Sequence, residues 1–272
     1  MRPVTSGKRA LSPPAFFLAD GARPGEPRLL PEDEQHATRV LRLGVGDLLV
    51  GLDGKGGRHP LRVRALRRGA VELEETGPAE VVPGPGQADA PLPWVEVAIA
   101  WPRRNRVEGM LDRLVQLGAA AIRPLAARQR GPGEAPEEAS PRLQRVAREA
   151  CKQSGRAWLP VFERTLTPEE LARHLRPGSA LAVLDPGAGL SLDTWLRSLR
   201  PAPIGLGARE SPIVLVIGPE GGFAEEEREA FLVCGASSTW LGPHVLRVET
   251  AAEAAMAVTA VVHGRARGSP SV

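Results

Sequence analysis

The spacing of apolar residues differs between the two ends of the chain. Over residues 16–75, apolar runs of strand length are separated by turn residues, which predicts a small β-rich unit. The DGKGG sequence at 53–57 joins two of these runs, and its glycines favour a hairpin turn that needs positive φ. A phosphate-binding loop is the alternative, but no helix follows the glycines. Between the runs, Ala37, Val40 and Leu41 recur at helical spacing and predict a short helix within a barrel.

A segment rich in proline and glycine, residues 76–93, follows this unit and has the pattern of a linker. Beyond it, apolar runs of strand length alternate with stretches of helical length, which predicts an α/β unit with a parallel sheet covered by helices on both faces. The predicted strands cover residues 94–101, 119–125, 180–184, 212–218 and 238–242, and the predicted helices cover 105–117, 140–154, 224–234 and 251–263. We therefore expect a β-rich unit over 1–75, a linker over 76–93, an α/β unit over 94–264 and a tail over 265–272.

Two predicted helices begin with recognisable capping residues. Ser140 followed by Pro141 is an N-cap with proline at the first helical position. Thr250 and Glu253 have the spacing of a capping box, and the helix behind them consists almost wholly of Ala, Val and Met. Such a helix is buried on most sides, and its small residues allow another helix to approach closely. We therefore expect it to contribute to a subunit interface.

Length and composition are those of an ordinary globular protein. The chain has 272 residues, of which 42% are hydrophobic and 25% charged, and no segment approaches the roughly 20 apolar residues of a membrane helix. We therefore expect a cytoplasmic protein. The sequence contains two cysteines, Cys151 and Cys234, which excludes a disulfide framework and a four-cysteine zinc site. No cluster of His, Cys or Asp has ligand spacing, so we expect no metal.

The net charge of +3 is unevenly distributed along the chain. Residues 101–164 contain 13 Lys and Arg against 7 Asp and Glu, whereas residues 165–272 contain 9 against 12. The basic segment favours a surface for an anionic partner. The alternative is a set of solvated helix faces.

Three loops follow predicted C-terminal strands, at the strand ends where open α/β sheets bind their ligands. They cover residues 184–192, 218–227 and 241–255. Each alone is more often a tight turn, but three at strand ends together favour a small-molecule site. In the second loop, the glycines at 218, 221 and 222 let the backbone approach a ligand closely and direct main-chain groups at it.

Charged residues also stand close to these loops. The run Glu225–Glu227 opens a predicted helix and complements the positive end of its dipole, which is a structural role. In the last loop, Val245 and Leu246 can form an apolar wall, while Arg247 and Glu249 precede a buried helix. This charged pair either belongs to the site or is a salt bridge that fastens the loop.

Two of these loops carry a specific resemblance. The sequences IVLVIGPEGGFA at 213–224 and LGPHVLRVETAAEAA at 241–255 closely resemble the signature loops of the RsmE family of 16S ribosomal RNA uridine N3-methyltransferases. Three further stretches, HATRVLRLGVGD at 36–47, VEGMLDRLVQLGAAAIRPL at 107–125 and ACKQSGRAWLPV at 150–161, are similar to motifs of the same family. The resemblance runs from about residue 15 to residue 264.

The resemblance implies a PUA-like β-barrel followed by a SPOUT methyltransferase domain with a trefoil knot, and a homodimer. It implies S-adenosyl-L-methionine as cofactor and 16S ribosomal RNA of the small ribosomal subunit as partner. The residues expected at the cofactor are Leu184, Asp185, Pro186, Ile217, Gly218, Pro219, Glu220, Gly221, Gly222, Leu241, Gly242, Val245, Leu246, Arg247 and Thr250. Those expected at RNA are Arg39, Arg42, Arg103, Arg142, Arg145 and Lys152.

The chain also departs from the family pattern at five positions. His244 stands where the family usually has Arg, and Val248 where it usually has Thr. Gln116 replaces a usual Glu, Arg113 a usual Lys, and Ala15 an Arg that often precedes the aromatic pair. The glycine loops are intact, so these departures bear on RNA binding more than on the cofactor.

Methyl transfer to uridine N3 needs removal of the N3 proton and a cation for the charge that develops on the flanking carbonyl oxygens. Arg247 is the expected cation, with Glu249 orienting it, and Arg156 is a second candidate near the pocket. No residue is identified as a general base. The target base must be unpaired or flipped out, since pairing buries N3.

Other classes of function remain open at this point. A SPOUT enzyme that acts on a different RNA is the nearest alternative. A non-catalytic RNA-binding or ribosome-assembly protein would use only the barrel and the basic segment. A nicotinamide-dependent enzyme is disfavoured because no strand, GxGxxG and helix follow one another, and GPGEAP at 131–136 places prolines where such a helix would begin.

Overall fold

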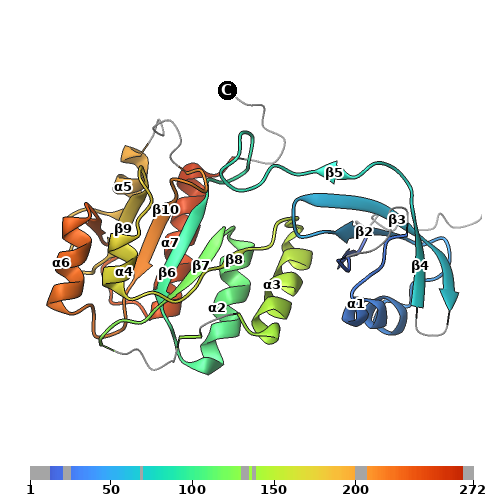
Figure 1. Cartoon of the computed structure of the whole chain (residues 1–272), viewed down its shortest axis with the longest axis horizontal. Coiled ribbons are helices and arrows are strands. Elements are labelled where there is room, and N and C mark those ends of the chain that lie inside the picture. Colours follow the sequence, from blue (N-terminus) through green and yellow to red (C-terminus); the bar gives the residue numbers. More distant parts are fainter. Residues whose placement is uncertain are drawn as a thin grey trace, which may run out of the picture. The chain divides into compact units, whose positions relative to one another are not determined.

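The computed structural model describes residues 13–20, 26–67, 70–129, 135–136, 139–199 and 207–265. It divides the chain into two compact units, residues 1–82 and 83–272 (Figure 1). The boundary falls within the segment expected as a linker. That segment also contains a short strand, β5 (Glu80–Val81), which pairs with β3 of the first unit. Most of the expected tail, residues 266–272, lies outside the described residues.

The first unit is built on a sheet with the path β1-β2-β3-β4. Its strands are β1 (Ala15–Phe17), β2 (Leu48–Leu52), β3 (Gly57–Arg67) and β4 (Ala70–Glu75). The predicted hairpin is confirmed, because β2 and β3 pair antiparallel and Gly54 and Gly56 between them have φ of 73° and 103°. The Oδ1 of Asp53 accepts hydrogen bonds from the backbone N–H groups of Lys55 and Gly57, which closes the turn.

The short helix of this unit is present but changes its winding. It begins as α1 (Pro31–Gln35) and continues as a π-helix, η1 (His36–Val40). Ala37 is buried as predicted, whereas Val40 and Leu41 are exposed. A π turn holds more residues than an α turn, so it moves these two side chains off the face that Ala37 occupies. The expected short helix is thus present, although Val40 and Leu41 do not share the buried face of Ala37.

The second unit contains a six-stranded sheet in the order β11-β9-β10-β6-β7-β8, and every pair in it is parallel. The predicted parallel sheet is thus confirmed. The strands are β6 (Val95–Ala100), β7 (Ala121–Leu125), β8 (Val161–Phe162), β9 (Ala180–Leu184), β10 (Ile213–Ile217) and β11 (Ser237–Thr239). Sequence periodicity missed β8, because two residues are too few to set a pattern.

Helices pack on both faces of this sheet (Figure 1). They are α2 (Arg104–Gln116), α3 (Pro141–Ser154), α4 (Pro168–Arg173), α5 (Leu192–Ser198), α6 (Glu225–Val233) and α7 (Val248–His263). Leu171 of α4 and Phe231 of α6 share a core cluster with Ala98, Val214 and Val216 of the sheet. Helix α7 packs on β6 and β10 and contacts α2 and α5. Helices α4 and α5 are one or two turns long and were not predicted.

The two predicted caps have different outcomes. Ser140 caps α3, and its Oγ accepts a hydrogen bond from the backbone N–H of Leu143 at 3.4 Å. The capping box at Thr250 and Glu253 was wrong. Helix α7 begins at Val248, and the carbonyl of its N-cap residue Arg247 already accepts from the N–H of Ala251. Both proposed cap residues therefore lie inside the helix.

Candidate functional site

Three loops converge on one cavity at the carboxyl edge of the sheet. They follow β9, β10 and β11, and the cavity between them has a volume of about 400 Å³. The parallel strands bring their carboxyl ends to the same edge, which explains why loops far apart in the sequence meet there. Of the residues expected at the cofactor, those that line the cavity are Leu184, Asp185, Pro186, Ile217, Gly218, Pro219, Glu220, Gly222, Leu241, Gly242, Val245 and Leu246. Gly221, Arg247 and Thr250 are not lining residues.

The loop at 218–222 is a compact turn. The N–H of Gly222 donates to the carbonyl of Pro219 at 2.8 Å, and Gly222 has a φ of 77°. A Cβ at Gly218 would lie 2.9 Å from the ring of Phe223, which is buried beneath it. Gly221 is turned outward, where a Cβ would overlap the Oε1 of Gln129. A side chain is therefore disfavoured for a different reason at each glycine: by the positive φ at Gly222, by the ring of Phe223 at Gly218 and by Gln129 at Gly221.

The cavity has apolar walls and a few charged groups. Asp185 lies at the end of β9, where its Oδ1 accepts from the N–H of Gly187 at 2.8 Å and its Oδ2 lies 3.4 Å from the Oγ of Ser238. Arg228 of α6 donates to the carbonyl of Phe223 at 3.0 Å. The carboxylate of Glu225 raises the pKa of the Arg228 guanidinium above its usual value, so this cation stays charged. Such a cavity suits a ligand with an apolar ring and ionised groups.

Arg247 and Glu249 do not form a pair. The Oε1 of Glu249 accepts from a guanidinium nitrogen of Arg106 at 2.6 Å, and Glu249 is buried. Arg247 is exposed, and among the described residues its guanidinium forms no hydrogen bond or ion pair. Glu249 lies in the first turn of α7 against α2, so the structure does not give it the expected task of orienting Arg247. The alternative of a salt bridge between Arg247 and Glu249 is not formed either, and Glu249 instead fastens α7 to α2 through Arg106.

Arg156 lies in a structural position. Its guanidinium donates to the carbonyl oxygens of Val115 at 3.0 Å and Ala119 at 2.8 Å, and burial lowers its pKa. Gly155, in the left-handed conformation, ends α3 and turns the chain so that Arg156 reaches the end of α2. Contrary to the expectation of a residue near the pocket, Arg156 is not among the residues that line the cavity.

The residues expected to contact RNA differ in how exposed they are and in whether they form ion pairs. Arg39, Arg42, Arg103 and Arg145 are exposed, and Arg142 forms an ion pair with Glu108. Lys152, which was also expected at RNA, is largely buried. Its side chain is 9% exposed and its Nζ lies 2.7 Å from a carboxylate oxygen of Glu149.

Several lining residues were missed by sequence reasoning. They are Val183, Phe223, Arg228, Phe231, Leu232, Ala236, Ser238, His244, Val248 and Ala251. Arg228, Phe231 and Leu232 have i, i+3, i+4 spacing, which places them on one face of α6. That spacing, in the helix that follows the glycine loop, is the signal that could have found them.

The described residues contain no candidate metal-binding group, disulfide or membrane-spanning helix. They include no group of three or more His, Cys, Asp or Glu that could hold a metal ion, and Cys151 and Cys234 are free thiols. Each helix in the described ranges is too short or too polar to span a membrane.

Comparisons with known proteins agree with this arrangement. Residues 89–260 match a family model described as RNA methyltransferase domain. The chain is 31% identical over 253 residues to ribosomal RNA small subunit methyltransferase E of Mycobacterium bovis, covering 87% of this chain and 86% of the relative. It is 32% identical over 223 residues to the protein of that name from Synechocystis, covering 80% and 67%. The structure of the Neisseria gonorrhoeae protein of that name, bound to S-adenosyl methionine, has a TM-score of 0.72 at 23% identity, over 93% of this chain and 98% of that chain.

Proposed function

The chain belongs to the family of ribosomal RNA small subunit methyltransferase E, and on this premise we propose that it transfers a methyl group from S-adenosylmethionine to N3 of a uridine in 16S ribosomal RNA. The observation that carries the proposal is the convergence of three loops on one cavity. The matched family supports RNA as the class of substrate. The signature loops that the chain shares with uridine N3-methyltransferases support the choice of the acceptor atom.

The cavity fits the proposed cofactor in size and chemistry. Its volume of about 400 Å³ lies in the range of small-ligand sites. Leu184, Leu241 and Leu246 offer apolar surface for an adenine ring, and the open space at Gly222 permits main-chain contacts. Carboxylates of Asp185 and Glu220 complement the positive charges of the sulfonium and amino groups. Gly221, Arg247 and Thr250 would act beside the cavity rather than in its lining.

The bound cofactor supplies an electrophilic methyl group, and the chain supplies alignment and electrostatics. Arg247 is exposed between the lining residues Leu246 and Val248, so its guanidinium can reach a base held at the rim of the cavity. There it would stabilise negative charge on the uracil carbonyl oxygens as the N3 proton leaves. Glu249 contributes through Arg106, by fixing the first turn of α7 behind that rim.

The finer features of the fold belong to the same proposal. We assign the first unit to a PUA-like barrel and the second to a knotted SPOUT domain, because motifs that resemble those of the family occur in both units. Arg39 and Arg42 of the first unit, and Arg103, Arg142 and Arg145 of the second, are the side chains proposed to contact phosphate. Their recognition of a folded RNA favours the small ribosomal subunit over naked RNA as substrate.

A homodimer completes the proposal. Helix α7 presents Val261, which is 80% exposed, together with the half-buried Ala254, Ala257 and Val258. These residues share one face of the helix, and an apolar face of small residues allows close packing against a second copy.

The deciding experiment incubates small ribosomal subunits with the protein and labelled cofactor, followed by nucleoside analysis. We expect 3-methyluridine and one reverse-transcription stop in 16S RNA, because a methyl on N3 removes a pairing donor. Arg247→Ala should abolish the stop while cofactor affinity is retained, and Arg197→Ala, an exposed arginine paired with Asp193 on α5, serves as the matched control. A product of 5-methyluridine or ribose methylation would rule out N3 chemistry. Failure to bind the cofactor would favour a non-catalytic RNA-binding protein.

A further inference from the structure

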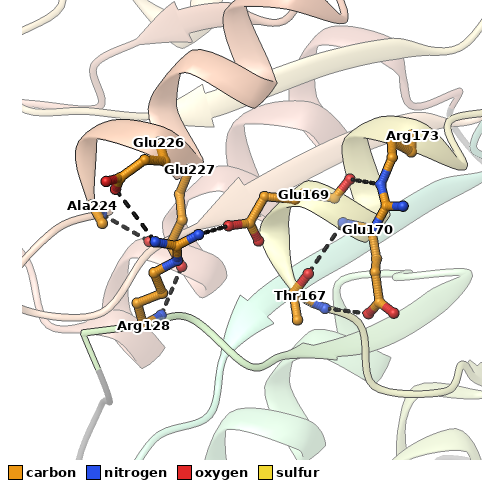
Figure 2. Close-up of polar contacts among 8 residues, drawn as sticks. All are labelled: Arg128, Thr167, Glu169, Glu170, Arg173, Ala224, Glu226 and Glu227. Atoms are coloured by element: carbon orange, nitrogen blue, oxygen red, sulfur yellow. Dashed lines mark hydrogen bonds and ion pairs between the residues drawn. The ribbon is translucent and has the colours of Figure 1, made fainter.

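A buried carboxylate stands behind the glycine loop. Glu227, in the first turn of α6, is 0% exposed. Its Oε2 accepts from the N–H of Ala224 at 2.8 Å, and its Oε1 accepts from the N–H of Arg128 at 2.7 Å (Figure 2). Helix geometry explains the first contact, which satisfies a free N–H at the start of α6. The second joins residues 99 positions apart and lies outside any helix-capping pattern.

The hydrogen bond from Ala224 to Glu227 fixes the end of the glycine loop, residues 218–222. Ala224 directly follows Phe223, whose ring is buried against Gly218 and whose carbonyl accepts from Arg228. The loop is thus held at β10, by its internal Gly222 to Pro219 hydrogen bond, and at the Ala224 N–H. Moving Ala224 would shift the main-chain groups of 218–222 that border the cavity.

The hydrogen bond from Arg128 to Glu227 holds the segment after β7, residues 126–129. Residues 126–129 leave the sheet beside the glycine loop, and Gln129 is the residue whose Oε1 occupies the space next to Gly221. The guanidinium of Arg128 spans the surface, 2.9 Å from Glu169 of α4 and 3.6 Å from Glu226 of α6 (Figure 2). Exposed pairs of this kind contribute little, so the buried backbone contact to Glu227 is the main link between the two segments.

We propose that Glu227 is a positioning residue, which locks segment 126–129 to the glycine loop and thereby sets the loop geometry that binds the cofactor. This inference rests on the proposed function and adds a residue that does not line the cavity. The chemistry requires a carboxylate, because both partners are N–H donors. A glutamine offers one acceptor oxygen, and its NH₂ group would face the second donor.

The test compares Glu227→Gln with Glu226→Gln. The two substitutions remove the same charge from adjacent positions of the same helix turn, but Glu226 is exposed and contacts only the Arg128 side chain among the interactions drawn in Figure 2. We expect Glu227→Gln to raise both the cofactor Kd and the cofactor KM about tenfold, because it leaves a buried donor unpaired at the loop. The kcat at saturating cofactor and the KM for small ribosomal subunits should stay within about twofold of wild type, as should all values for Glu226→Gln.

A lowered thermal midpoint with unchanged cofactor KM and Kd would show a purely structural carboxylate and overturn the proposal. Equal effects of both variants would also overturn it, since charge at the helix terminus would then suffice. Absence of cofactor binding by the wild-type protein would instead refute the proposed function.

Gln129→Ala keeps the experiment decisive if Glu227→Gln does not fold. Gln129 is exposed, so its truncation leaves the core intact while it removes the contact with Gly221. We expect a cofactor affinity about threefold weaker, as for the loss of one modest contact. An unchanged affinity would mean that segment 126–129 does not act on the loop, and the proposal would fail.

Discussion

Gly221 and Gly222 are adjacent, and each position disfavours a Cβ for a different reason. Gly222 has open space around its Cα but a φ of 77°, which is costly for any residue with a Cβ. Gly221 has no positive φ, and a Cβ there would meet the movable end of Gln129. Backbone conformation is therefore the constraint at one position, and contact with a second loop at the other.

Gly222→Ala should lower the free energy of unfolding by about 1 kcal/mol, through the left-handed conformation alone. The cofactor affinity should fall as well, because Gly222 lines the cavity and the loop must shift to relieve the strain. Gly189→Ala is the matched control, since Gly189 also has open space but no positive φ. Urea denaturation and calorimetry measure the two effects, and a neutral Gly222→Ala would contradict them.

Burial of Cys151 predicts an inert thiol. Desolvation raises its pKa from 9.0 to about 11, despite the opposing field of Arg156. At pH 8 only about one such thiol in a thousand is ionised, so alkylating reagents should modify Cys151 only after unfolding. The half-buried Cys234 is the internal comparison. Because the fold favours the neutral thiol, its contribution to stability is present below the unfolded pKa and is lost as pH rises through about 11. Rapid native labelling of Cys151 at pH 8 would contradict the buried position.

Most loop residues that the sequence predicted at the cofactor line the cavity. The contacts of Glu249 and Arg156, in contrast, differ from those predicted. The loop positions follow from one rule, that ligands bind at the carboxyl ends of parallel strands. The groups that a charged side chain contacts depend on the direction in which the chain leaves a helix or strand. Arg156 follows the left-handed Gly155 and is thereby aimed at carbonyl groups of α2, which no spacing in the sequence reveals.

Two ion pairs fasten α7 to α2. Arg106 pairs with Glu249 at 2.6 Å, and Arg113 pairs with Glu253 at 2.8 Å. The pairs differ in burial. The side chains of Arg106 and Glu249 are 27% and 12% exposed, whereas Arg113 is 53% exposed. The first pair therefore has the larger effect on the start of α7.

Arg106→Met should reduce the free energy of unfolding by about 2 kcal/mol, because it leaves the carboxylate of Glu249 buried and unpaired. Arg113→Met is the control and should cost less, because Arg113 is 53% exposed and the carboxylate of Glu253, 21% exposed, is more accessible than that of Glu249. Chemical denaturation of both variants checks the order. Equal losses would mean that burial of Glu249 does not decide the effect.

The elements themselves were predictable where they are long. The apolar run of β9, the β-branched run of β10 and the apolar stripe of α3 are long enough to be recognised in the sequence. Helix α7 was placed correctly but begins three residues before the predicted start, because its N-cap residue is Arg247, whose side chain makes no capping hydrogen bond. Helices α4 and α5 do have local start signals, a capping box at Thr167 and Glu170 and an N-cap at Ser191, but they and β8 are too short to show a period.

The exposed face of α7 is the surface on which the proposed homodimer depends. Val261→Asp would place a charge in the proposed interface, and it should convert a species of twice the chain mass into monomers. Val233→Asp is the control, because Val233 is equally exposed but lies on α6. Sedimentation velocity distinguishes the two states. A wild-type monomer, or a Val261→Asp dimer, would refute this interface.

Charge that is segregated in the sequence is partly compensated in space. Basic residues of 101–164 form ion pairs with acidic residues of 165–272, as Arg106 does with Glu249 and Arg128 with Glu169. Others form ion pairs within the segment, as the buried Arg123 does with Glu163. The balance of charges along the sequence therefore overestimates the basic surface available to an anionic partner.

The arginines that remain exposed should determine the salt dependence of RNA binding. Arg103 and Arg145 form no ion pair among the described residues, so each can displace counterions from a phosphate. Replacing either with Gln should lower the slope of log K against log salt by about 1, and both together by about 2, with cofactor affinity unchanged. Lys152→Gln removes the same charge from a side chain that is 9% exposed and paired with Glu149, so it should leave the slope as it is. Filter binding of small ribosomal subunits over a salt series measures these slopes. If Lys152→Gln changed the slope as much as Arg145→Gln, net charge rather than surface position would govern binding, and the assignment of this arginine surface to RNA would be wrong.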